Sequence, residues 1–200
     1  MSDIKLSVRP ATPNDALAIG EVQADAMAEA LSAALERDLS HETRASLDGS
    51  QLASTWMMTI GNMPSEDHHV LVADSGGTVQ GFAAVVPAEP IILDGDDPAG
   101  LDADTGEPRV AFEITNFDVP QRFADAEHEA RLLAAITDII KDSGGTELHM
   151  WVIAGNDAQT QFLNGAGFAP RPVRRVAEVD GGEVAEHLWW TLLDPEPEAA

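Results

Sequence analysis

The 200 residues include 35 acidic and 11 basic side chains, so the formal net charge is −24. A DNA- or RNA-binding protein, or an anionic-membrane anchor, needs a basic surface, and this excess of acid excludes both classes. No cysteine is present, which excludes disulfides, thiolate metal sites and a catalytic thiol. Hydrophobic residues make up 44% of the chain, enough to bury a core. We expect one cytoplasmic domain over 1–193, followed by an acidic tail over 194–200.

The first half of the chain is predicted to alternate between strands and helices. In chain order we expect a strand over 4–9, helices over 16–35 and 51–60, strands over 69–74 and 79–86, and a strand over 110–119. Thr12 and Pro13 have the residue types that begin a helix, as N-cap and first helical residue. Between 88 and 108 the chain has seven acidic residues and no Lys or Arg. Because Gly and Pro also recur there, we expect this segment to be a solvated loop.

The second half contains the clearest helix of the sequence. Its apolar residues follow a 3.6-residue period: Leu132, Leu133, Ile136, Ile139 and Ile140. A Gly-Gly pair at 144–145 is expected to end this helix. The remaining predicted elements are a strand over 148–153, a helix over 156–166, and strands over 168–179 and 184–193 joined by a turn at 180–182. This order predicts a mixed sheet with helices on its faces.

Three segments together resemble the GNAT superfamily of acyl-CoA-dependent N-acetyltransferases. They are the strand 110–120, Arg131-Leu132-Leu133 at the start of the clear helix, and Asn156 with Phe162 and Gly167-Phe168. The resemblance implies an α/β domain with a mixed, mostly antiparallel central sheet flanked by helices. It also implies acetyl-CoA as cosubstrate, held at Phe117 and Val119 on a splayed strand and at Asn156 after the next strand. No metal site is implied.

The resembled family seats the cofactor pyrophosphate at the start of the helix after that strand, on a loop with a basic or amide residue and two small residues. Counted without gaps, Ala124 takes the basic position, and Glu127 and Glu129 take the two glycine positions. A second register places small residues correctly within 121–126 but needs an extra helical turn; we prefer the gap-free one. Acids at Asp125, Glu127 and Glu129 stabilise a helix N-terminus and repel a phosphate, so acyl-CoA binding is expected to be weakened.

The resemblance assigns the general base to Glu113 on the same strand. A carboxylate among apolar neighbours is expected to have a raised pKa, although a solvent-facing strand residue fits the pattern equally well. The family's frequent proton-donating tyrosine falls at Leu163, and the chain has no tyrosine. His149 and Trp151 share one face of the next strand, and we expect them to pack in the core.

An acceptor pocket is expected near the second helix, where the resembled family shapes it. Met57 and Met58, beside Trp56, suit an apolar pocket or simple core packing. The adjacent His68 and His69 point to opposite faces of a strand, so they do not form a metal site.

Three arginines gather near the end of the chain, at Arg171, Arg174 and Arg175. In so acidic a protein they form a local positive spot. Three partners are compatible with this pattern: the acidic 88–108 loop, a partner subunit or a ligand phosphate. Pairing within the protein is the simplest interpretation.

The sequence therefore predicts a GNAT-like N-acyltransferase that moves an acetyl group from CoA to an amine of a small molecule. The acidic surface weakly favours a cationic acceptor, and pairing into a homodimer is possible for this architecture. The alternative is a GNAT-like module for ligand sensing or interaction that has lost ordinary acyl-CoA binding.

Overall fold

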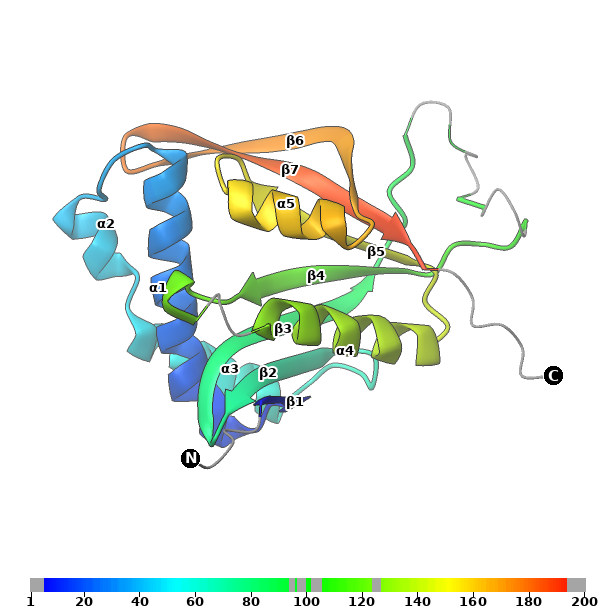
Figure 1. The fold of residues 1–200 in the computed structure, drawn as a ribbon, viewed down its shortest axis with the longest axis horizontal. Coiled ribbons are helices and arrows are strands. Elements are labelled where there is room, and N and C mark those ends of the chain that lie inside the picture. The colour runs from blue at the N-terminus through cyan, green and yellow to red at the C-terminus, as the bar shows by residue number, and fades with distance from the viewer. Residues whose placement is uncertain (1–5, 94–95, 97–99, 102–105, 124–126, 194–200) are drawn as a thin grey trace.

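A seven-stranded sheet forms the centre of the computed structural model, which describes residues 6–93, 96, 100–101, 106–123 and 127–193. The strands are β1 Leu6–Pro10, β2 His69–Ser75, β3 Thr78–Ala88, β4 Ala111–Asp118, β5 Glu147–Ile153, β6 Ala169–Val179 and β7 Gly182–Leu192. Their spatial order is β1-β2-β3-β4-β5-β7-β6 (Figure 1). Neighbouring strands are antiparallel except β4 and β5, which are parallel. The predicted mixed, mostly antiparallel sheet is confirmed.

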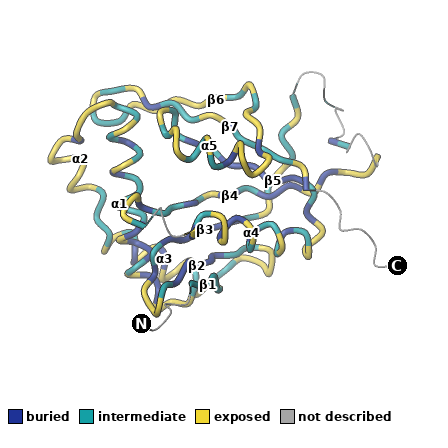
Figure 2. The backbone as a smooth tube through the Cα atoms, in the orientation of Figure 1, coloured by how far each residue is buried: buried dark blue, intermediate teal, exposed yellow. Residues whose placement is uncertain are grey.

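Helices cover both faces of this sheet. They are α1 Ala16–Ala34, α2 His41–Ser46, α3 Gly49–Gly61, α4 His128–Asp142 and α5 Asp157–Gly165, with short 3-10 turns η1 Pro13–Asp15 and η2 Gln121–Phe123. α4 and α5 bury Leu132, Ile136 and Leu163 against the face that carries Phe112. α1 and α3 cover the other face around Phe82. Figure 2 shows the central strands buried, whereas α2 and β6 are largely exposed.

The predicted elements are found where apolar spacing indicated them. In α4 the apolar face is buried, and the helix ends just before Gly144, which has a φ of 76°. One element, α2, was not predicted. It has six residues and no buried side chain, so it has no apolar periodicity, and it begins where Ser40 caps the Thr43 N–H.

α1 and α3 approach each other unusually closely, which fixes how they lie on the sheet. A Cβ added at Gly20 of α1 would lie 2.2 Å from the Gly49 carbonyl oxygen and 2.6 Å from the Ala53 nitrogen. These neighbours are backbone atoms and cannot rotate away. Glycine is therefore required at this crossing, and it holds α3 beside the sheet end where Trp56 packs edge-on against Phe82.

Candidate active site

The parallel pair β4 and β5 separates partway along its length. Their pairing runs from Ala111–Glu147 to Ile114–Met150, after which β4 continues to Asp118 while β5 pairs with β7 alone. Opposite β3, the register jumps at Thr115, which is an extra residue on β4. Such a bulge bends a strand and increases its twist, which turns β4 away from β5. We call the resulting opening the β4–β5 fork.

A groove lies over the fork, between α4 and α5. It has a volume of about 660 Å³ and is lined by Ala130, Leu133, Ala134, Thr137, Asp138, Gln161, Phe162, Gly165 and Ala166. Phe162 stacks on Phe117 of β4, with ring centroids 5.9 Å apart. Because Phe117 lies beyond the last β4–β5 pair, the groove meets the fork at this stacked pair. Small residues on both helices leave the groove wide.

On the opposite face of the sheet, Glu113 lies one residue before the last β4–β5 pair. Its carboxylate is 3.8 Å from Nε2 of His149, the residue directly opposite it on β5. The His149 imidazole holds the pKa of Glu113 below its usual range, against burial, which acts to raise it. The expected raised pKa is therefore wrong, because the nearby His149 imidazole outweighs desolvation. Glu113 is ionised at neutral pH, as a general base must be.

His149 belongs to a buried chain of charged groups. Its Nδ1 lies 3.4 Å from Glu147 Oε1, and Arg109 Nη1 lies 2.8 Å from the other Glu147 oxygen. Burial acts to lower the pKa of His149, but Glu113 and Glu147 together raise it above the ordinary value. Ile91 donates its backbone N–H to Glu147 Oε1 at 3.2 Å. His149 is buried as expected, but in an ionic chain rather than in apolar packing.

Sequence reasoning missed Arg109 and Glu147. Arg109 ends the acidic segment 88–108 and Glu147 begins β5, and charged residues at such positions are ordinarily exposed. One signal was present, since Glu147 and His149 are two residues apart on a strand and so share a face. It gave no hint of Arg109, which comes from another part of the chain.

Two of the three arginines near the end of the chain, Arg171 and Arg175, pair within the protein, as the simplest interpretation held. Arg171 binds Asp96 of the acidic loop at 2.9 Å and lies 3.7 Å over the Trp190 ring. Arg175 binds Glu186 and lies over Trp151. The described part of the 88–108 segment is therefore anchored, through Asp96, to the strands beside the site.

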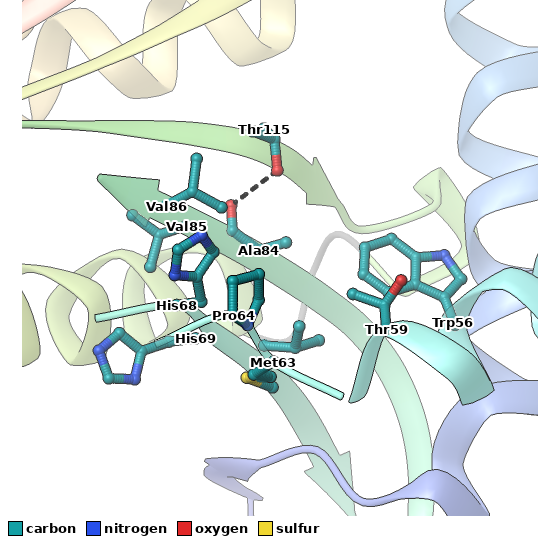
Figure 3. A pocket seen from close by; sticks show the side chains of 11 residues that line it. Trp56, Thr59, Met63, Pro64, His68, His69, Ala84, Val85, Val86 and Thr115 are labelled. Carbon is teal, nitrogen blue, oxygen red and sulfur yellow. Dashed lines mark hydrogen bonds between the residues drawn. The ribbon is translucent and has the colours of Figure 1, made fainter. Parts of the chain in front are cut away.

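A cavity of about 100 Å³ lies between α3 and the strands β2, β3 and β4, and we call it the Trp56 cavity. Figure 3 shows the side chains that line it. It is lined by Trp56, Thr59, Met63, Pro64, His68, His69, Val70, Ala84, Val85, Val86 and Thr115. Val86 is directly opposite Glu113 in the β3–β4 register, so their side chains share a face. Burial lowers the pKa of His69, which favours its neutral form. The cavity is thus almost wholly apolar.

The methionines expected here lie elsewhere. Met57 is 54% exposed and Met58 is 64% exposed, so neither lines the cavity and neither is packed in the core. α3 presents Trp56 inward, and one residue later the helical rotation turns Met57 to solvent. Met63, which follows α3, lines the cavity in their place.

Comparison with known proteins adds structural relatives only. The sequence matches no protein-family model and no curated protein. A GNAT-family acetyltransferase from Streptococcus pneumoniae superposes with a TM-score of 0.59 at 18% identity, covering 95% of this chain and 100% of that one. Ribosomal-protein-alanine N-acetyltransferase from Brucella melitensis gives 0.63 at 18% identity, with coverage of 94% and 99%. PaiA N-acetyltransferase from Thermoplasma acidophilum, in complex with coenzyme A, gives 0.59 at 17% identity, with 92% and 98%.

The chain has the GNAT fold. Of the residues expected to serve this fold, Phe117 buries its side chain in the core and Val119 packs on the same cluster. Asn156 caps α5, since its side-chain oxygen accepts the Gln159 N–H at 3.2 Å. Leu163, at the family's tyrosine position, is fully buried.

The α4 N-terminus is where the GNAT fold was expected to seat a pyrophosphate. Ala124 and Asp125 lie outside the described residues. Glu127 occupies the N-cap position without a side-chain capping hydrogen bond, and its φ of 59° is in the left-handed region that favours glycine. Its carboxylate is paired with Arg131 at 3.3 Å. Burial raises the pKa of Glu129, which is half-buried in the first turn.

Two further findings concern the described residues as a whole. None of their helices is long and apolar enough to cross a membrane. Among the same residues, no cluster of three or more His, Cys, Asp or Glu side chains is arranged to hold a metal ion.

Proposed function

We propose that this protein transfers an acetyl group from acetyl-CoA to an amine of a small molecule. The observation that carries the proposal is the arrangement around the β4–β5 fork. A wide groove meets the fork on one face of the sheet, and an ionised Glu113 beside the Trp56 cavity lies on the other. Two substrates that approach from opposite faces would meet at this gap. Structural neighbours with the same fold are acetyltransferases, one of them in complex with coenzyme A.

The groove fits the pantetheine arm of acetyl-CoA. Its floor is apolar, and β4 has no strand partner on the β5 side beyond Ile114 among the described residues, so its backbone can hydrogen-bond an extended ligand there. The phosphate end fits less well. Glu129 and Glu127 place acid at the helix N-terminus, where free N–H groups otherwise attract anions. We therefore expect acetyl-CoA to bind more weakly than it would if Glu127 and Glu129 were uncharged.

The chemistry follows from the position of Glu113. The amine nitrogen attacks the thioester carbonyl carbon, the carboxylate of Glu113 accepts the amine proton, and the carbon–sulfur bond breaks. The CoA thiolate then leaves and takes a proton from water, because the position of the family's tyrosine is occupied by buried Leu163. A carboxylate of lowered pKa is ionised across the neutral range, so it has a free lone pair for the proton, although it is a weaker base than one that titrates near pH 7.

The Trp56 cavity supports a small apolar group next to the reacting amine. Its volume of about 100 Å³ has room for only a few heavy atoms, and its lining includes no Lys, Arg, Asp or Glu. A long polyamine gains little from such a cavity, although the outer surface is acidic. We infer that the acceptor is a compact amine with a single charge and a short apolar substituent, in place of a polyamine, which net charge favours.

Calorimetric titration with acetyl-CoA tests the first half of the proposal. We expect measurable binding that tightens roughly two- to five-fold for each charge removed in Glu127→Gln and Glu129→Gln, because each acid near a helix N-terminus contributes about 0.3–1 kcal/mol. Glu42→Gln on exposed α2 is the matched control and should leave affinity unchanged. Absence of binding to any acyl-CoA would refute the transferase and favour an interaction module.

Thiol release from acetyl-CoA, measured with a panel of amines, tests the second half. Compact amines with a short apolar substituent should be acetylated faster than spermidine. Glu113→Gln should lower kcat by about 100-fold or more, as expected for loss of a general base. Glu178→Gln, on exposed β6, should have wild-type kcat. Full activity of Glu113→Gln at every pH would remove Glu113 as the base.

A further inference from the structure

We propose that His149 is the positioning residue for Glu113, and that Glu147 and Arg109 hold His149 in place. This role rests on the proposed function, because it assigns a purpose to the base that the function requires. The two ring nitrogens of His149 each face one carboxylate, Nε2 toward Glu113 and Nδ1 toward Glu147. These are ion-pair distances, 3.8 Å to Glu113 and 3.4 Å to Glu147, so the two carboxylates attract the ring from both ends and favour the orientation that places Nε2 toward Glu113.

Four groups of alternating charge make up the chain: Glu113, His149, Glu147 and Arg109. Three of them are buried, with side-chain exposures of 2% for His149, 0% for Glu147 and 5% for Arg109, whereas Glu113 is 29% exposed. The chain thus runs from the interior to a single reachable carboxylate. A substrate can touch Glu113. Of the three buried groups, His149 faces Glu113 directly, whereas Glu147 and Arg109 can influence Glu113 only through His149.

Packing alone does not account for this chain. Each buried ion costs several kcal/mol of desolvation, and apolar residues of similar volume commonly stabilise such a site equally well. The neighbouring positions on this face show that apolar or aromatic side chains fit, since Trp151 follows His149 on the same side of β5 and Trp190 is directly opposite it on β7. Ionic groups at 147 and 149 therefore indicate a role in the chemistry at Glu113.

The charged groups that face this pair come from four segments. Glu113 itself is on β4, and the others are Glu147 on β5, Arg109 before β4 and Arg175 on β6. Arg175 also lowers the pKa of Glu113. Replacing His149 with a neutral side chain leaves burial, which raises the pKa of Glu113, opposed only by the more distant Arg175. The base should then lose its charge at a higher pH than in the wild type.

The test is the pH dependence of kcat/KM for the acceptor amine, in wild type and His149→Gln. We expect the acid limb to move up by about one pH unit, as for loss of a nearby opposite charge, so that activity on that limb falls up to about ten-fold while activity at pH 7 is little changed. KM for acetyl-CoA should not change, since His149 is on the other face from the groove. His187→Gln on β7, where the side chain is exposed, is the matched control and should keep the wild-type profile.

A second measurement does not depend on the stability of His149→Gln or on turnover. The imidazole of His149 is titrated by NMR in wild type and Glu113→Gln, and loss of the carboxylate should lower its midpoint. An unchanged midpoint overturns the proposal. A wild type that acetylates amines while His149→Gln keeps the same pH profile overturns the positioning role alone. A wild type that acetylates no amine overturns the proposed function and this role with it.

Discussion

Replacing Arg109 with methionine is the sharpest test of the buried ionic chain. The substitution keeps much of the aliphatic volume and removes the charge that neutralises Glu147. The guanidinium lies 2.8 Å from a carboxylate that is completely buried, and it also donates to the Gly100 carbonyl at 3.3 Å. At an effective dielectric constant of about 20, an N–O separation of this size corresponds to about 6 kcal/mol of attraction.

The desolvation of both ions offsets much of that attraction, so the net effect is smaller. Removal of one partner from a buried pair costs about 3–5 kcal/mol, because the other charge remains in the interior. We expect Arg109→Met to lower the free energy of unfolding by this amount at pH 7. Urea titration followed by tryptophan fluorescence measures this loss of stability, since Trp151 and Trp190 lie beside His149 in the buried ionic chain.

An exposed ion pair in the same protein provides the control. Arg122 binds Asp25 with both side chains about half exposed, so Arg122→Met should cost about 0–1 kcal/mol. The double variant Arg109→Met with Glu147→Met should recover part of the loss, since it leaves no uncompensated Glu147 charge. If Arg109→Met were no more destabilised than Arg122→Met, the reasoning from burial would be refuted.

Three further predictions concern stability. Gly20→Ala should destabilise by roughly 1–3 kcal/mol in urea titration despite a better helix propensity, because its Cβ would meet backbone of α3, whereas Gly61→Ala, with nothing within 4 Å, should be neutral. Arg9 holds the pKa of Asp15 well below its usual range, so the stabilisation from this ion pair is complete above about pH 4 and is lost as pH falls further. Asp15→Asn should lower the free energy of unfolding by about 1–2 kcal/mol at pH 7 and should make stability less dependent on pH below pH 4. Burial raises the pKa of Asp118 to about 7, so stability should fall as pH rises from about 4 to about 7, and thermal melts of Asp118→Asn should lack that decrease.

Local pattern was sufficient for most of the fold. The apolar period of α4, the alternation in the strands and the Gly-rich turns each depend on residues close in sequence, and the structure has these elements where they were predicted. The helix α2 was missed because it buries nothing and is maintained by a cap at Ser40. The resemblance to a family added the arrangement of the sheet, since the pairing of β4 with β5 in parallel is not visible in either strand alone.

The site was predicted only in part. Glu113 stays a prediction from the resemblance, and the expected direction of its pKa shift was wrong, because His149, which lowers it, comes from a different strand. Met57 and Met58 were expected inside, yet helix rotation turns them outward and Met63 lines the cavity. These errors share a cause. Each depends on which face of a strand or helix packs against which other element, and that is decided by tertiary structure.

The sequence by itself determined the net charge and the order of most of the elements, since composition and short-range periodicity are properties of the chain alone. Tertiary structure alone decided that the β4–β5 fork opens at Ile114, and that Arg109, Glu147 and His149 converge behind Glu113. The physical reason is that a buried charge is tolerated only beside its partner, and the partners of Glu147 come from segments that are distant in sequence.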